Sequence, residues 1–137
     1  MSKLADEFLS SHNCKDKVKF MELNFFTDDY PKVDVIVLGH VLHMFPAERR
    51  QILLDRAFKA LKKGGAVIQI DFNVAENKKK YSMEDLASQI VSAQMQWLEH
   101  GFERTIQDDT AALKKAGFRN MWSQRLGVDT AIIGYKL

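Results

Sequence analysis

The sequence has little of what marks several protein classes. Cys14 is the only cysteine among 137 residues, so the chain cannot form an internal disulfide, which favours a reducing compartment. The longest apolar stretch, residues 35–42, is interrupted by His40 and is far too short to cross a bilayer. Residues 1–11 lack the apolar core of a signal peptide. We therefore expect a soluble, cytoplasmic protein.

The sequence also lacks the patterns typical of nucleic-acid binding, membrane binding, a metal site or a catalytic nucleophile. The formal net charge of +2 is too small to favour nucleic acid or a membrane surface. The only basic run, Lys78 to Lys80, has no aromatic residues between its members to stack on bases, so we interpret it as a solvated loop. No group of His, Cys, Asp and Glu has the spacing of a metal site, and no Ser or Cys lies at a nucleophile elbow. We expect no nucleic acid, no membrane and no metal.

The residues that are present alternate between strand and helix patterns. Apolar positions predict a helix from Lys3 to Ser11, ended by Asn13, and then a strand from Val18 to Leu23. The run from Val33 to Leu38 is rich in β-branched residues. Such a run predicts a strand buried on both faces, as in parallel sheets.

The central and C-terminal patterns complete an α/β arrangement. A helix is predicted from Ala47 to Lys62, with Pro46 at its start and Gly64 past its end. The strand from Ala66 to Phe72 then closes a βαβ unit, whose crossover is right-handed in nearly all proteins. Two further helices and an antiparallel hairpin follow, at Ser82–His100 (with Ser82 and Asp85 as a capping box), Thr105–Gly117, Phe118–Leu126 and Thr130–Lys136, with Gly127 in the turn. We predict one α/β domain over residues 1–137, with a mostly parallel sheet.

Polar groups gather at the carboxyl ends of the predicted strands. Asn24 and Phe25 follow the first strand, His40 and His43 follow the second, and Asp71 closes the third. Ligands of open parallel sheets bind outside these strand ends. The topology therefore brings an amide, an aromatic ring, two imidazoles and a carboxylate to one edge of the sheet.

Four stretches, in their order and spacing, resemble the family-2 O-methyltransferases, a family of plant caffeate-type and bacterial natural-product enzymes. They are Val33 to Pro46, Ile52 to Gly65, Val67 to Asp71, and Glu103 to Asp108 followed by Leu113 to Phe118. The resemblance covers nearly the whole chain and implies the C-terminal part of such an enzyme. It implies a Rossmann-like class I methyltransferase sheet, S-adenosylmethionine as the methyl donor, and a small-molecule hydroxyl as the acceptor.

Carried over position by position, the resemblance implies roles for five residues. His43 matches the general base that takes the hydroxyl proton, which suits an imidazole because its ordinary pKa lies near neutrality. Asp71 and Asp108 match two acids that flank and orient the histidine. Asn24 and Phe25 match the pair that contacts the adenine of the cofactor.

Each catalytic role has a structural alternative. His43 can be a loop histidine bonded to a backbone carbonyl, and Asp71 can bond the backbone where its strand ends. Asp108 lies three residues after Thr105, which is the spacing of a helix capping box, and an acid there also favours the helix dipole. For Asp108 we favour the structural role, although one residue can serve both.

The sequence departs from the family beside the base and in the acids. Met44 and Phe45 replace an Asp-Trp pair, and both flanking acids are aspartates where the family has glutamates. An aspartate is about one methylene shorter, which reduces its reach toward the ring. Asn24 keeps a hydrogen-bonding amide but lacks the charge of the family's acid.

Most of the cofactor site is absent from the chain. The family binds methionine and ribose through a glycine-rich loop after its first strand and an acid ending its second. Gly64 and Gly65 cannot replace that loop, because they precede a strand, whereas a cofactor loop follows one. The family's N-terminal helical domain, through which it dimerises, has no counterpart either.

The missing strands leave two hypotheses for function. The resemblance places the first two strands of the sheet beside Val33–Leu38, so that strand has an unpaired edge that can pair with a second copy or with a partner chain. The chain is therefore either a working or reconstitutable part of a methyltransferase, or a non-catalytic remnant that acts in association.

Overall fold

The computed structural model describes residues 2–12, 14, 16–73 and 104–137, together with residues 83, 86, 87, 89, 90, 93 and 94. Three sequence predictions fall wholly or largely outside these residues. They are the end of the first helix at Asn13, the basic run Lys78–Lys80, and the helix Ser82–His100 with its capping box.

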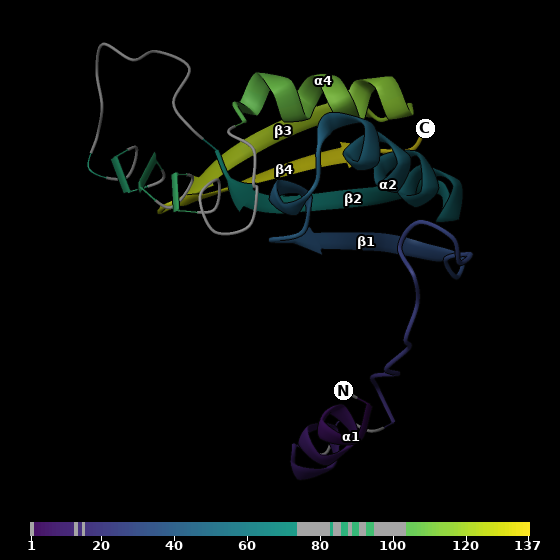
Figure 1. The fold of residues 1–137 in the computed structure, drawn as a ribbon. Coiled ribbons are helices and arrows are strands. Elements are labelled where there is room, and N and C mark those ends of the chain that lie inside the picture. The colour runs from purple at the N-terminus through teal and green to yellow at the C-terminus, as the bar shows by residue number, and fades with distance from the viewer. Residues whose placement is uncertain are drawn as a thin grey trace.

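Four strands form one mixed sheet in the order β1-β2-β4-β3 (Figure 1). β1 (Val33–Gly39) pairs in parallel with β2 (Leu61–Phe72), and β4 (Asp129–Tyr135) pairs antiparallel with β2 and with β3 (Arg119–Leu126). The predicted βαβ unit and the closing hairpin are therefore both present. Because the hairpin adds to the far side of β2, the two inner strands of the sheet are β2 and β4.

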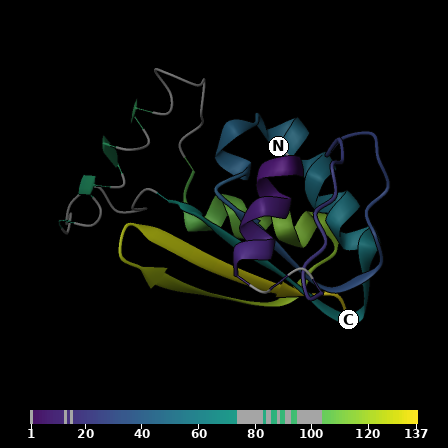
Figure 2. The same cartoon turned by 90° about the horizontal axis from the view of Figure 1, so that it is seen from below.

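Two helices cover one face of this sheet. α2 (Ala47–Ala60) joins β1 to β2, and α4 (Ile106–Ala116) precedes β3. They pack against each other and against β2, β3 and β4, and Figures 1 and 2 show them on the same side. The core lies between this helix layer and the sheet, and it consists of Leu42, Leu53, Leu54, Leu61, Val67, Leu113, Phe118 and Ile132.

The opposite face of the sheet is apolar and open. One row across it joins Val37, Ile68, Ile133 and Trp122, which are paired strand to strand. Val37 is 58% exposed and Trp122 is 48% exposed. The prediction that the β1 strand is buried on both faces is therefore wrong, because no described element packs on this side.

The prediction of a strand from Val18 to Leu23 is wrong, because the backbone of this segment is irregular in the structure. A strand needs a hydrogen-bonded neighbour, and the described part of the chain offers none to this segment. The first helix, α1 (Ser2–Ser11), lies apart from the sheet in Figure 1, and residues 16–32 lead from its side of the molecule to β1. The apolar side chains of Leu4 and Phe8 on α1 are exposed.

The predicted end of helix α2 is also wrong. The helix ends at Ala60 instead of Lys62, and Gly64 lies inside β2 with a φ of +82°. Residues 62–65 bulge out of the β1–β2 ladder. Within the bulge, the Gly64 N–H donates to the Lys136 carbonyl at 2.7 Å. Gly64, which the sequence predicted as the residue that ends the helix, instead adopts its left-handed conformation in a bulge of β2.

The ends of α4 match the prediction. Thr105 caps its first turn together with Asp108, and Gly117 ends it in a left-handed conformation with a φ of +111°. The hairpin turn contains Gly127 with a φ of +66°.

None of the described helices combines the length and the apolar content that a membrane span requires.

Candidate functional site

His43 lies at the carboxyl end of β1, in the short 3-10 helix η1 (Leu42–Met44). The turn before η1 is built by His40, which has a positive φ of 52° and donates its backbone N–H to the Ile70 carbonyl on β2 at 2.9 Å. This bond extends the β1–β2 pairing past the end of β1 and folds the chain back over the sheet edge. As a result the imidazole of His43 is buried, with only 7% of the residue exposed.

Asp71 on β2 holds His43 at two points. Its Oδ1 lies 2.8 Å from Nδ1 of the imidazole, and its Oδ2 accepts the backbone N–H of His43 at 3.1 Å. An ionised carboxylate can only accept hydrogen bonds, so Nδ1 is the protonated nitrogen of a neutral His43. Nε2 is then the nitrogen with a free lone pair, which is what a general base requires. The sequence placed these two residues on one edge, and the structure brings them into contact.

A buried ion pair continues from Asp71. Arg104 donates to Asp71 Oδ2 at 2.9 Å and to Asp109 Oδ1 at 2.7 Å, and all three side chains are almost fully buried. Gln69 and Asn73 complete the arrangement by donating to Asp109 Oδ2. Buried charges persist when they are paired and hydrogen-bonded on most sides. His43 is thus oriented by Asp71, which is itself fixed by a network anchored on α4.

The charges of this network reinforce one another. Burial by itself would raise the pKa of Asp71, but the hydrogen bond from His43 and the charge of Arg104 outweigh it and lower that pKa below its ordinary value. For Arg104, burial opposes the charge, and the carboxylates of Asp109 and Asp71 overcome it and raise its pKa. Asp71 is therefore an anion at neutral pH, and its carboxylate accepts from both His43 and Arg104.

Sequence reasoning assigned no role to Arg104 or Asp109. Arg104 lies within the Glu103–Asp108 stretch of the resemblance, which was the one signal that could have pointed to it. Asp109 adjoins Asp108, and only the direction of each side chain from α4 distinguishes them. Helix periodicity turns neighbouring residues about 100° apart, so two adjacent acids serve two different sites.

Asp108 caps α4. Its Oδ2 accepts the backbone N–H of Thr105 at 2.9 Å and the Thr105 hydroxyl at 2.8 Å, and these bonds lower its pKa. Among the described residues it forms no hydrogen bond with His43 or Asp71. It lines a cavity of about 440 Å³ between α2 and α4, which Arg50 and Arg104 also line. The geometry matches the structural alternative stated for Asp108.

Asn24 and Phe25 lie in a turn before β1. The side-chain oxygen of Asn24 accepts the Phe26 N–H at 2.9 Å, and the Asn24 carbonyl accepts the Asp28 N–H at 3.0 Å. Phe25 is partly exposed and lines an apolar cavity of about 260 Å³ whose other walls include Leu38 and Val41 at the end of β1. Within the described part of the chain, neither residue hydrogen-bonds to His43 or Asp71.

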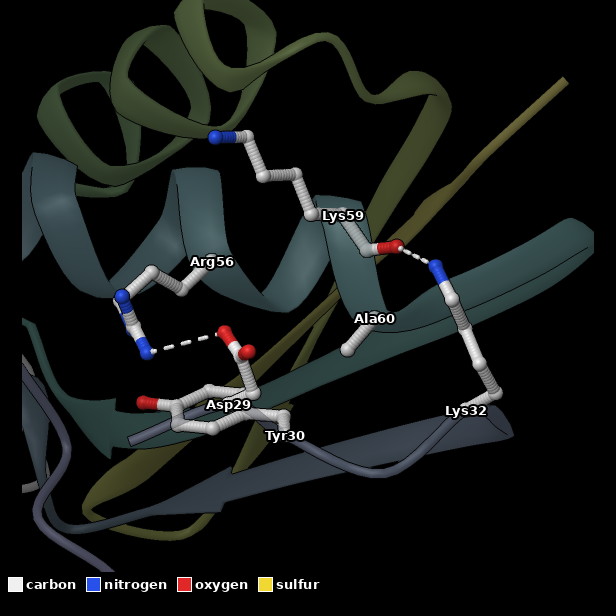
Figure 3. Close-up of a pocket in the computed structure, with 6 residues that line it drawn as sticks. All are labelled: Asp29, Tyr30, Lys32, Arg56, Lys59 and Ala60. Atoms are coloured by element: carbon white, nitrogen blue, oxygen red, sulfur yellow. Dashed lines mark hydrogen bonds and ion pairs between the residues drawn. The ribbon is translucent and has the colours of Figure 1, made fainter. Parts of the chain in front are cut away.

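A separate pocket of about 390 Å³ lies between the loop before β1 and α2, and Figure 3 shows its lining. Arg56 lies over the Tyr30 ring at 5.4 Å and 3.8 Å from Asp29, while Lys32 donates to the Lys59 carbonyl at 2.7 Å. The Lys59 amine points away from these groups in Figure 3. These contacts join the loop before β1 to α2, and the pocket contains no site residue predicted from the sequence.

Comparison with known proteins assigns the chain to a family. Residues 2–119 match the O-methyltransferase domain family model. The tetracenomycin polyketide synthesis 8-O-methyl transferase TcmO of Streptomyces glaucescens is 31% identical over 137 residues, which is 99% of this chain and 40% of TcmO. The N,N-dimethyltransferase OxyT of Streptomyces rimosus is 31% identical over 132 residues, which is 92% of this chain and 36% of OxyT.

A solved structure agrees with these matches. Human N-acetylserotonin methyltransferase in complex with SAM is similar with a TM-score of 0.76 and 26% identity, covering 97% of this chain and 44% of that one. The chain belongs to the O-methyltransferase domain family, and the resemblance seen in its motifs is confirmed. It spans about 40% of the length of the curated relatives it matches.

Proposed function

We propose that this chain forms the C-terminal part of an S-adenosylmethionine-dependent methyltransferase that acts on the hydroxyl of a small molecule. The observation that carries the proposal is the buried His43–Asp71 pair at the carboxyl end of β1, in which Asp71 bonds Nδ1 and leaves Nε2 as the nitrogen that can accept a proton. The family supports the same reaction class.

In this proposal His43 Nε2 accepts the hydroxyl proton while the acceptor oxygen forms its bond to carbon. The cofactor, when bound, supplies a methyl group on a sulfonium and leaves as the neutral thioether. The positive charge lost by the sulfonium is balanced by the proton on His43. Asp71 stabilises the resulting imidazolium through its bond to Nδ1, and Arg104 keeps Asp71 in position.

The residues present fit one end of the cofactor. Phe25 lines an apolar cavity beside the end of β1, which suits the flat face of an adenine, and Asn24 precedes Phe25 in the same turn. A glycine-rich loop for the methionine and ribose is absent from the sequence. We therefore propose Asn24 and Phe25 as adenine contacts of an incomplete site.

The proposal extends to partners and location. The outer edge of β1 has no strand beside it in the described chain, and Val35 and Val37 next to it are about half exposed. Such an edge pairs readily with another chain, so we propose self-association or a partner that supplies the missing strands. The low cysteine content supports the cytoplasm.

Calorimetric titration of the purified chain with S-adenosylmethionine tests the cofactor. A Kd at or below about 100 μM, near −5.5 kcal/mol, supports a site completed by a second copy. No heat up to about 1 mM contradicts cofactor binding by this chain and favours the non-catalytic alternative, a remnant that acts in association.

Methyl transfer to a panel of phenols, alcohols and amines tests the reaction. His43→Ala should lower the rate by about 10²–10⁴-fold, while His12→Ala, directly after the end of α1, should leave it unchanged. Amines enter the panel because OxyT is an N,N-dimethyltransferase. Transfer to amines alone contradicts the hydroxyl acceptor, and transfer that survives His43→Ala contradicts the base.

Sedimentation at tens of micromolar tests association. Val37→Lys should shift a dimer toward monomer because it places a charge beside the free edge, and Ser123→Lys on the opposite edge strand is the matched control. A compact monomer of the unchanged chain contradicts this part of the proposal.

A further inference from the structure

The cavity between α2 and α4 brings two arginines together. Its volume of about 440 Å³ lies within the usual range of small-molecule sites. Arg50 lines it from α2, Arg104 lines it from the segment just before α4, and Lys115 lines it from α4. Neither His43 nor Asp71 is part of its wall, so it is a separate site from the proposed base.

Each of the two arginines has one buried nitrogen without a partner. Nη1 of Arg50 and Nη1 of Arg104 form no hydrogen bond with any described residue. The Arg104 side chain is only 1% exposed, and its Nε and Nη2 are already engaged by Asp109 and Asp71. A buried charged donor without a partner is costly, and an acceptor bound in the cavity would remove that cost at both nitrogens.

The charge of Arg50 is not fully offset by its surroundings. Burial, together with the charge of Arg104, lowers the pKa of Arg50 below its ordinary value, and the nearby carboxylates do not make up the difference. A water molecule can accept hydrogen bonds from both guanidinium groups, but it carries no charge. An anion accepts the same bonds and also attracts both cations.

Two acids, Glu48 and Asp108, also line the cavity, and both are exposed. Exposed charges are screened by water and salt, and Oδ2 of Asp108 is engaged by Thr105 in the cap of α4. The first turn of α2 contributes charge of the other sign. Ala47 lines the cavity, and Pro46 gives this helix end no side-chain cap, so its partial positive charge also favours an anion.

We propose that this cavity binds the carboxylate or phosphate group of a small molecule, with Nη1 of Arg50 and Nη1 of Arg104 as donors. Guanidinium groups suit such anions, because their planar N–H groups match the oxygens of a carboxylate or a phosphate. Lys115, which is exposed at the cavity, adds a third positive charge. The site does not depend on the proposed reaction, because its binding is measured without methyl donor or acceptor.

The test is a calorimetric titration of the full chain with inorganic phosphate and, separately, with benzoate, in a buffer of low ionic strength. We expect one anion per chain with a Kd at or below about 1 mM for at least one probe. Binding of phosphate alone assigns the site to a phosphate group, and binding of benzoate alone assigns it to a carboxylate. The bound probe should also raise the melting temperature, whereas sodium chloride at the same ionic strength should not.

Arg50→Met should weaken binding by about tenfold or more, because it removes one of the two charged donors. Among the described residues Arg50 has no hydrogen-bond partner that the change would leave unpaired, so the fold should survive. If this variant lowers the amount of folded protein, Arg50→Gln replaces it. Arg104 is not the residue to change first, because it also binds Asp71 and Asp109.

Arg49→Met is the matched control, because it removes the same charge from the next residue of α2. The guanidinium of Arg49 lies over the Phe26 ring instead of the cavity, so the affinity should change by less than about twofold. The proposal is overturned by a Kd above about 1 mM for both probes, by equal losses of affinity in Arg49→Met and Arg50→Met, or by a rise in melting temperature that sodium chloride reproduces.

Discussion

β1 and β2 are neighbouring parallel strands of similar composition, yet they lie in different environments. Val67 on β2 is fully buried between the sheet and the helices, whereas Val37 on β1 is 58% exposed. β2 has a strand on each side and a helix layer over one face, while the described residues give β1 one neighbouring strand and leave one of its faces uncovered. Because the hydrophobic contribution scales with the apolar area removed from water, the same residue type should stabilise the fold more on β2 than on β1.

The polar residues follow the same division. On the covered face of β2, Gln69 and Asp71 belong to the buried network with Arg104 and Asp109. On β1 the charged Asp34 remains exposed and pairs with Lys62 at 3.0 Å. Buried charges depend strongly on their partners, whereas an exposed pair contributes little.

The largest effect should come from removing the cation of the network. Arg104→Met leaves Asp71 and Asp109 as buried carboxylates without their shared partner, and we expect unfolding to become easier by about 3–5 kcal/mol. Urea denaturation measures this change. Arg49→Met, an exposed arginine over the Phe26 ring, should cost at most about 1 kcal/mol. Equal changes in the free energy of unfolding for the two variants would mean that the buried ion pairs of Arg104 stabilise the fold no more than an exposed arginine does.

Acid should act through Asp71. Its pKa is lower in the folded chain than in the unfolded one, so its contribution to stability is present above the ordinary value near 3.9 and is lost as pH falls through the lowered pKa. Asp71→Asn should therefore flatten the decline in stability between about pH 5 and pH 2, measured by denaturation at each pH. A flat stability profile between these pH values for the unchanged chain would contradict the prediction.

Matched truncations compare the two strands directly. Val67→Ala should cost about 2 kcal/mol through lost burial and the cavity left behind. Val37→Ala should change the free energy of unfolding of the monomer by less than about 0.5 kcal/mol. Chemical denaturation at low protein concentration measures both. A large loss from Val37→Ala that grows with protein concentration would instead show that the open face is covered by another copy.

The smallest effect concerns the cap of α4. Thr105→Ala removes the hydroxyl that accepts the Asp108 N–H at 3.1 Å, and we expect a loss of about 1 kcal/mol. Thr105→Ser keeps the hydroxyl and should lie close to the unchanged chain. Thermal unfolding followed by circular dichroism distinguishes the two, and equal melting temperatures would mean that the cap is not needed.

Much of the fold could be read from local patterns. The capping box of Thr105 and Asp108 and the glycines at 117 and 127 predicted α4 and the hairpin, because caps and turns depend on neighbouring residues. The same reasoning failed at Gly64, where a left-handed glycine suits a helix stop and a bulge equally well. The segment from Val18 to Leu23 failed for another reason, since alternation predicts a strand only when a neighbour is present to pair with it.

The candidate site divides in the same way. Strand order placed His43 and Asp71 on one edge, and the structure adds the 2.8 Å contact between them. Arg104 and Asp109 join the site from beyond β2, at separations that no local pattern records.

The sequence by itself determined the βαβ unit, the ends of α4, the hairpin and the edge at which polar groups collect, because each depends on backbone conformation and short-range periodicity. Only the tertiary structure decided which apolar faces are covered, which of two adjacent aspartates enters the core, and which charges share a hydrogen bond. Those outcomes depend on burial and on distances of a few ångströms between residues far apart in the chain, and such distances exist only once the chain is folded.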